Sequence, residues 1–260
     1  MRYFLRLAYN GRNYFGWQTQ PDNVNIQDCI EYALGKLLRE TIRITGAGRT
    51  DTGVHASQFY AHFDTTQDLI PLKNDLIGHL NAFLPNDIAI YDLFPVKDNA
   101  HARFDALSRH YQYRVTCQKN PFVLDSAYRI FFQPDINTMN TCADILKEYT
   151  DFTSFSKLHT QTKTNNCKIT HAYWHEKNGL LLFDIIADRF LRNMVRAIVG
   201  TLLEVGKHKI SELEFRSIIE SKNRCNAGTS VPAHALYLTE ITYPDDLFSL
   251  KDAPDQVAPF

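Results

Sequence analysis

The sequence predicts an α+β fold built from two halves, each with the element order strand, helix, strand, strand, helix, strand. Segments in which every second residue is apolar indicate strands, and segments in which apolar residues recur at helical spacing indicate helices. These segments follow one another in that order, and the order occurs twice. In this split arrangement, called ferredoxin-like, both helices can cover one face of an antiparallel sheet. Two such sheets side by side would form a cleft between them.

The first half begins with a strand at residues 3–9, which is rich in aromatic and long apolar residues and ends at the Asn10-Gly11 turn signal. Residues 26–38 carry apolar side chains at helical spacing, and Asn25 is a suitable N-cap. The remaining elements are predicted as strands at 42–44, 57–63 and 88–94 and a helix at 72–83.

The second half repeats this order. A strand is predicted at 110–116, and a hairpin is predicted around Lys177-Asn178-Gly179, with strands at 169–175 and 180–187. Helices are predicted at 139–149, 190–205 and 211–220, and a last strand at 235–242. We therefore expect an N-terminal half at 1–104, a C-terminal half at 105–245 and an acidic tail at 246–260.

Composition limits the function classes. Lys and Arg number 28 against 29 Asp and Glu, a formal net charge of −1, so any surface for nucleic acid must be local. The five cysteines are widely spaced without a Cys-x-x-Cys pair, and no His-x-x-x-His occurs, so neither a disulfide framework nor a metal site is predicted. With no export signal and no run of ~18 apolar residues, we expect a cytoplasmic protein that does not span a membrane.

The densest cluster of special residues is the glycine-rich segment 46–56. Its three glycines allow a tight loop, and Arg49 and Asp51 are two residues apart, so in extended backbone they project to the same side. A guanidinium there would keep the Asp51 carboxylate ionised, as a nucleophile or general base requires. The alternative is that Asp51 only caps a turn while Arg49 is solvated.

Two further segments combine arginines with apolar or aromatic residues. Segment 101–114 interleaves three arginines with Phe104, Tyr111 and Tyr113, a pattern that suits unpaired bases but also ordinary cross-strand packing. On the helix predicted at 190–205, an apolar sector lies opposite a face that collects Arg189, Arg192 and Arg196. Val199 and Leu203 adjoin Arg196 and would partly desolvate it, which favours binding of a carboxylate or phosphate.

These motifs together resemble the tRNA pseudouridine synthase A (TruA) family over nearly the whole chain. The similarity rests on the order and spacing of several short motifs: Gly48-Arg49-Thr50-Asp51-Thr52-Gly53-Val54-His55-Ala56, Tyr14-Phe15-Gly16-Trp17-Gln18, Asn81-x-Phe83-Leu84-Pro85, His101-Ala102-Arg103-Phe104, Asp151-Phe152-Thr153-Ser154-Phe155, Asn193-Met194-Val195-Arg196 and Ala233-His234-x-Leu236-Tyr237-Leu238. Asp188-Arg189 departs from the family pattern, which bears on local RNA contacts.

The resemblance implies a pseudouridine synthase fold, with two ferredoxin-like halves around a central antiparallel sheet. It implies that Asp51 is the catalytic aspartate, that Tyr111 stacks on the target base, and that Arg49 and Arg196 bind substrate and position or neutralise the carboxylate. The implied activity converts uridines 38 to 40 of the tRNA anticodon stem-loop into pseudouridine, in a homodimer and without metal or organic cofactor. The target base would have to be flipped out of its stem.

Two rival functions remain open from the residues. A nucleoside glycosidase would also place a carboxylate near C1′, but it would need a second carboxylate as acid, for which Asp64, Asp68 and Asp105 are the candidates. A non-catalytic RNA-binding module would use the basic and aromatic segment 101–114 alone.

Overall fold

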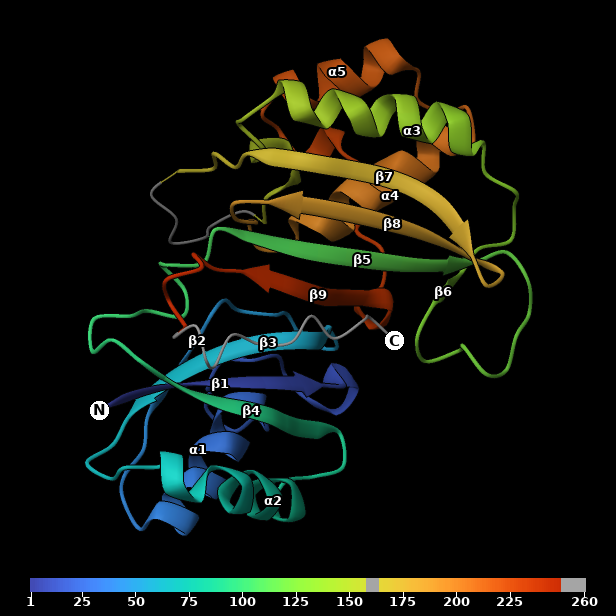
Figure 1. Cartoon of the computed structure of the whole chain (residues 1–260). Coiled ribbons are helices and arrows are strands. Elements are labelled where there is room, and N and C mark those ends of the chain that lie inside the picture. The colour runs from blue at the N-terminus through green and yellow to red at the C-terminus, as the bar shows by residue number, and fades with distance from the viewer. Residues whose placement is uncertain (158–163, 249–260) are drawn as a thin grey trace. The chain divides into compact units, whose positions relative to one another are not determined.

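The structure is a computed structural model that describes residues 1–157 and 164–248 (Figure 1). The chain divides into two compact units, which we call unit 1 (Met1–Leu107 with Leu238–Phe260) and unit 2 (Ser108–Tyr237). The boundary between the two units after Leu107 lies three residues beyond the end of the predicted N-terminal half, 1–104. From Leu238 onward, the last strand groups with unit 1.

Unit 1 has the predicted ferredoxin-like arrangement. Its elements are β1 (Arg2–Tyr9), α1 (Ile26–Leu38), β2 (Ile44–Gly46), β3 (His55–Asp64), α2 (Lys73–Phe83) and β4 (Ile88–Val96). The strand order is β4-β1-β3, with β2 and β9 (Leu236–Thr242) also paired to β3. The β1–β3, β1–β4 and β2–β3 pairs are antiparallel. Both helices lie on one face of this sheet (Figure 1).

Helix α1 follows from local signals that the sequence carries. The side chain of Asn25 accepts a hydrogen bond from the backbone N–H of Asp28, which caps the first turn as predicted. The helix ends at Arg39, whose φ of 56° is left-handed. Between these ends, Ile30 and Leu34 are fully buried, so the apolar face predicted at helical spacing is the face that packs into the core.

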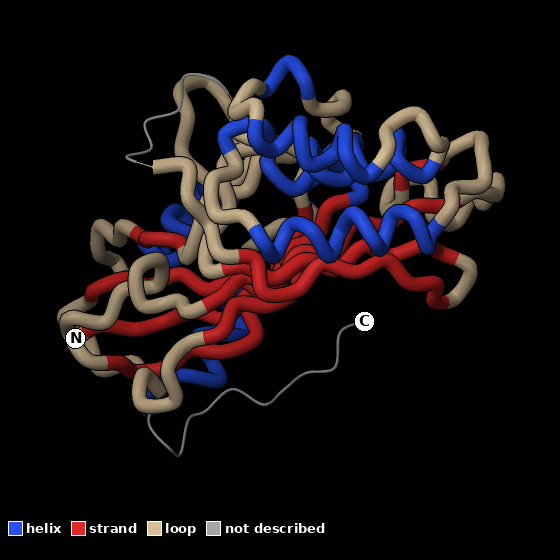
Figure 2. Tube along the Cα trace, turned by 90° about the horizontal axis from the view of Figure 1, so that it is seen from above, coloured by secondary structure: helices blue, strands red, loops and turns tan. Residues whose placement is uncertain are grey.

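Unit 2 contains the second set of elements: β5 (Ser108–Thr116), β6 (Tyr128–Arg129), α3 (Ile136–Ile145), β7 (Ile169–Lys177), β8 (Leu180–Ala187), α4 (Met194–Gly206) and α5 (Glu212–Glu220). Its strand order is β5-β8-β7, with antiparallel pairing, while β6 adds a short parallel pair to β5. The helices cover one face (Figure 2). The hairpin turn contains Asn178 and Gly179, both with positive φ, as two-residue turns require.

The α+β class is confirmed, and the main departure concerns α4. The helix was predicted to begin at residue 190, but it begins at Met194 because Asn193 adopts a left-handed conformation with φ 66°. Arg189 and Arg192 therefore lie before the helix, and of the three arginines only Arg196 projects from it. The α3 helix is also displaced from 139–149, because Asp135 caps it and it continues into a 3-10 turn at Leu146–Glu148.

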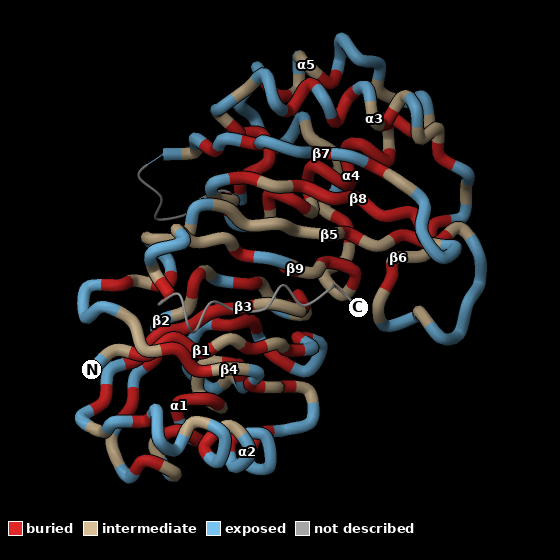
Figure 3. The backbone as a smooth tube through the Cα atoms, in the orientation of Figure 1, coloured by how far each residue is buried: buried red, intermediate tan, exposed pale blue. Residues whose placement is uncertain are grey.

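The central strands of each unit are its most buried part (Figure 3). Among the aromatic side chains that are fully buried are Phe4 and Phe59 in unit 1 and Tyr113, Trp174 and Phe183 in unit 2. The third residue of the predicted acidic tail, Phe248, belongs to the core of unit 1, since it is buried and its ring lies 5.1 Å from that of Phe94. Residues 249–260 of that tail lie outside the described residues.

A buried imidazole in unit 1 makes stability depend on pH. His62 is 6% exposed and its Nδ1 accepts a hydrogen bond from the backbone N–H of Ala102. Burial, with a smaller contribution from Arg2, lowers the pKa of His62 to about 4. Since the unfolded chain takes up this proton near pH 6.5, the stabilisation is complete above pH 6.5 and is lost as the pH falls to 4.

We therefore expect the free energy of unfolding to fall by about 2–3 kcal/mol between pH 6.5 and pH 4. Urea denaturation across this range would measure it. The His62→Gln variant should show a flatter profile, whereas replacement of the exposed His171 by glutamine should leave the profile unchanged. A steep profile that survives in His62→Gln would contradict this assignment.

Candidate active site

The glycine-rich loop connects β2 to β3 and is held by backbone hydrogen bonds on both sides of Asp51. The N–H of Trp17 donates to the carbonyl of Thr50 at 3.2 Å, and the N–H of Gly53 donates to the carbonyl of Tyr14 at 3.3 Å. Within the loop, the N–H of Val54 donates to the carbonyl of Asp51 at 3.1 Å. The segment around Trp17 therefore fixes the backbone on either side of the carboxylate.

Glycines make this contact between the two segments possible. A β-carbon on Gly16 would lie 2.4 Å from the Thr50 carbonyl oxygen, and the φ of Gly16 is +90°. A β-carbon on Gly46 would lie 2.6 Å from the indole of Trp17. Gly48, by contrast, has nothing within 4 Å of the equivalent position. The packing therefore requires glycine at positions 16 and 46, but not at position 48.

Side-chain contacts beneath the loop add to its rigidity. A hydrogen bond of 2.9 Å joins the hydroxyls of Tyr9 and Thr50, and Thr50 is buried. The ring of Tyr9 packs on Phe59 and Trp17, and the centroids of Trp17 and Phe59 are 4.2 Å apart. Sequence reasoning missed this support, because Tyr9 and Thr50 are far apart in the chain.

Removal of the Tyr9 hydroxyl tests this support. We expect Tyr9→Phe to lower the free energy of unfolding by about 1–2 kcal/mol, because it leaves a buried hydroxyl unpaired. Turnover should fall several-fold because the loop loses a restraint beside Asp51. Denaturation and initial-rate measurements would check both effects. A loss of stability with normal turnover would show that this hydrogen bond does not position the carboxylate.

Asp51 and the residues on either side of it lie in different environments. Asp51 is half-buried, Thr50 is buried and Arg49 is exposed. Within the described residues Arg49 makes no hydrogen bond or ion pair, so the predicted pairing of its guanidinium with Asp51 is absent from the structure. Exposure leaves the Arg49 guanidinium accessible to a phosphate.

Tyr111 and Arg196, the two other predicted site residues, lie in unit 2. Tyr111 is on β5, is half-buried and packs edge-on against Phe190 at 5.2 Å. Tyr113 shares its face, as predicted, whereas Gln112 and Arg114 form a hydrogen bond to each other on the opposite face. The β5 strand thus carries Tyr111 next to the segment that leads into α4.

Arg196 is oriented by a segment that the sequence did not reveal as functional. Its Nε donates to the carbonyl of Val231 at 2.7 Å, and the N–H of Val231 donates back to the Arg196 carbonyl at 3.2 Å. The segment approaches α4 closely, since a β-carbon on Gly200 would lie 1.9 Å from the Thr229 carbonyl oxygen. Arg196 is half-buried, as its apolar helical neighbours predict.

The three carboxylates of the glycosidase alternative have structural contacts. Asp64 forms a two-point ion pair with Arg2, with both N–O distances 2.8 Å. Asp68 accepts hydrogen bonds from the Tyr3 hydroxyl and from the N–H of Ile70. Asp105 accepts from the N–H of His101 at 2.7 Å. None of them lies in the Asp51 loop, and the retaining and inverting mechanisms both need two carboxylates flanking one bond.

In residues 1–157 and 164–248, no group of three or more His, Cys, Asp or Glu side chains could hold a metal ion. No helix in this part of the chain has the length and apolar character to cross a bilayer.

The fold and the loop define an α+β protein that presents one carboxylate from a rigid turn, as expected of an enzyme. The profile of the tRNA pseudouridine synthase family matches residues 7–105 and 149–244. These ranges include Arg49, Asp51 and Arg196, while Tyr111 lies between them. The chain belongs to the tRNA pseudouridine synthase family.

Curated relatives agree with this assignment over nearly their full lengths. The chain is 53% identical to tRNA pseudouridine synthase A of Parabacteroides distasonis over 251 residues, covering 96% of this chain and 99% of the relative. It is 52% identical to the protein of that name from Porphyromonas gingivalis, covering 95% and 99%. For the Clostridium acetobutylicum protein of that name the identity is 37%, covering 92% and 98%.

Proposed function

We propose that this protein converts uridine to pseudouridine in tRNA, at positions 38 to 40 of the anticodon stem-loop, with Asp51 as the catalytic residue. The observation that carries the proposal is the Asp51 loop, in which backbone hydrogen bonds fix the residues on both sides of one half-buried aspartate. A group that acts at a single carbon of a bound nucleotide must be held in position in this way.

The reaction replaces one bond between uracil and ribose by another and leaves the composition of the RNA unchanged. The bond between N1 of uracil and C1′ of the ribose breaks, the uracil turns, and its C5 bonds to C1′, while the proton leaving C5 is replaced by one arriving at N1. Asp51 can attack C1′ or the base, or take a proton from the sugar. Because an isomerisation involves no net oxidation, we propose that no redox cofactor takes part.

The other site residues have complementary roles in this proposal. Tyr111 stacks on the flipped uracil, which offsets the cost of unstacking. Arg49, exposed beside Asp51, binds a backbone phosphate. Arg196, whose Nε is held by the Val231 carbonyl, binds the substrate with the rest of its guanidinium. A site that retains the detached uracil also keeps water from the sugar carbon.

We further propose that the protein acts in the cytoplasm as a homodimer. Free thiols at all five cysteines suit a reducing compartment. The net charge of one chain is near zero and gives little attraction for a polyanion, whereas a dimer would bring the arginines of two copies to one tRNA.

Incubation with an unmodified tRNA transcript tests the proposal. Wild-type protein, with chelator present, should produce carbodiimide-dependent reverse-transcription stops at uridines 38 to 40. The RNA should keep its mass, and no free uracil should appear. Release of uracil would favour the glycosidase. Binding of tRNA without stops would favour the RNA-binding module supported by the segment 101–114.

A further inference from the structure

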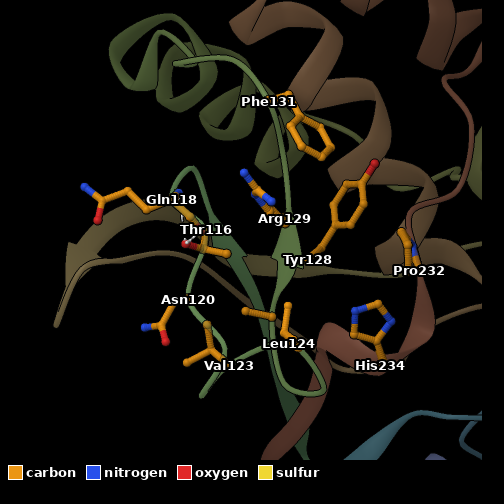
Figure 4. A pocket seen from close by; sticks show the side chains of 11 residues that line it. Thr116, Gln118, Asn120, Val123, Leu124, Tyr128, Arg129, Phe131, Pro232 and His234 are labelled. Carbon is orange, nitrogen blue, oxygen red and sulfur yellow. Dashed lines mark hydrogen bonds between the residues drawn. The ribbon is translucent and has the colours of Figure 1, made fainter.

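A concave site lies entirely within unit 2, at the Thr116 end of β5 (Figure 4). It is an open pocket of about 250 Å³ lined by the end of β5, the loop that follows it, β6 and the segment containing Pro232 and His234. None of the residues given a catalytic role lines it. Its chemistry therefore needs a separate explanation.

The walls of this pocket separate apolar and polar groups. Val123, Leu124 and Pro232 provide apolar surface, while the exposed side chains of Gln118 and Asn120 point away from Phe131 and Arg129 (Figure 4). The Asn120 Oδ1 accepts from the N–H of Phe122. Within the described part of the chain, the Asn120 Nδ2 and the Gln118 side-chain amide have no hydrogen-bond partner. A nucleobase matches the apolar wall, because its faces are apolar.

An arginine and an exposed ring at the rim strengthen this match. Phe131 is 83% exposed, and the Arg129 guanidinium lies 4.6 Å from its ring centroid. The Nε of Arg129 is buried and lacks a hydrogen-bond partner among the described residues. Proteins stack unpaired bases on exposed aromatic rings and neutralise the phosphates of those nucleotides with a nearby cation.

Two elements link this pocket to the predicted substrate-binding residues of unit 2. Thr116 in its wall is five residues from Tyr111 along β5, a distance of about 16 Å in an extended strand. The carbonyl of Pro232 in its wall accepts from the Tyr113 hydroxyl at 2.9 Å, and the adjacent Val231 holds Arg196. When an RNA places one base at Tyr111, neighbouring nucleotides of the same RNA lie within this distance of that base and can reach the pocket.

We propose that the pocket binds the base of one unpaired nucleotide of the tRNA substrate, stacked on Phe131 at the rim, with its phosphate toward Arg129. This assignment rests on the proposed function, because it assumes that tRNA is the substrate. A nucleotide explains the exposed ring and the cation beside it together. A peptide would explain only the apolar wall.

Binding of a full-length unmodified tRNA transcript to Phe131→Ala tests the proposal. Loss of one stacked base should weaken tRNA binding about tenfold and raise KM by a similar factor, with kcat unchanged at saturating tRNA. Phe131→Trp should retain wild-type affinity because it keeps a ring. Leu213→Ala is the matched control, since Leu213 is 77% exposed on α5 of the same unit.

A second measurement locates the contact directly. Ultraviolet crosslinking of the wild-type protein to the transcript, followed by mass spectrometry, should find nucleotide adducts within residues 116–131. Unchanged affinity of Phe131→Ala would overturn the proposal and favour a peptide as the occupant. If the wild-type protein bound tRNA but formed no pseudouridine, the proposed function would fail, while the affinities of the Phe131 variants would still decide the occupant of the pocket.

Discussion

Replacement of Asp51 by asparagine is expected to abolish turnover while leaving the fold and tRNA binding intact. Asparagine has nearly the same size, and Asp51 is half-buried at a loop whose backbone is fixed by other residues, so the loop should keep its shape. The amide can neither act as a nucleophile nor take up a proton near neutral pH. We expect a loss of at least about 10³-fold in kcat, measured as pseudouridine formed under single-turnover conditions.

The control for this variant is its affinity for tRNA. Wild type and Asp51→Asn should bind the transcript within a few-fold of each other and unfold at similar denaturant concentrations. Asp105→Asn offers a comparison, because Asp105 accepts a backbone hydrogen bond outside the loop and should be dispensable for the reaction. Substantial pseudouridine formation by a correctly folded Asp51→Asn protein would refute the assignment of Asp51.

The parts of the fold that could be predicted depend on residues close together in sequence. Helix α1 was predicted with its bounds because Asn25 caps it and its apolar residues recur at helical spacing. The hairpin of β7 and β8 was predicted because Asn178 and Gly179 favour a two-residue turn. The start of α4 was not predicted, since an apolar pattern continues through Asn193 and does not reveal its left-handed backbone.

The candidate site could be predicted as a set of residues but not as a geometry. The loop around Asp51 was noticeable because its glycines and charged residues are adjacent in sequence. The contacts that hold it come from Tyr9, Gly16 and Trp17, more than 30 residues earlier, and no periodic pattern links them to the loop. The anchoring of Arg196 by Val231 was missed for the same reason.

Substitution of Gly16 by alanine is expected to lower both the stability of the protein and its activity. Alanine at Gly16 must adopt a φ of +90° and place its β-carbon 2.4 Å from the Thr50 carbonyl oxygen, so the two segments must separate. We expect the free energy of unfolding to fall by about 2–3 kcal/mol. Because the displaced segment carries the residue before Asp51, kcat should fall by about 10²-fold.

Gly48→Ala is the control in the same loop, because the added β-carbon meets nothing within 4 Å. Its unfolding free energy should match that of the wild type, measured by urea denaturation in parallel with Gly16→Ala. A defect of Gly48→Ala confined to KM would mean that RNA approaches the loop at this open position. If Gly16→Ala were destabilised but kept normal kcat, Asp51 would not depend on the backbone contact between Trp17 and Thr50, and the rigid-loop explanation of the site would be wrong.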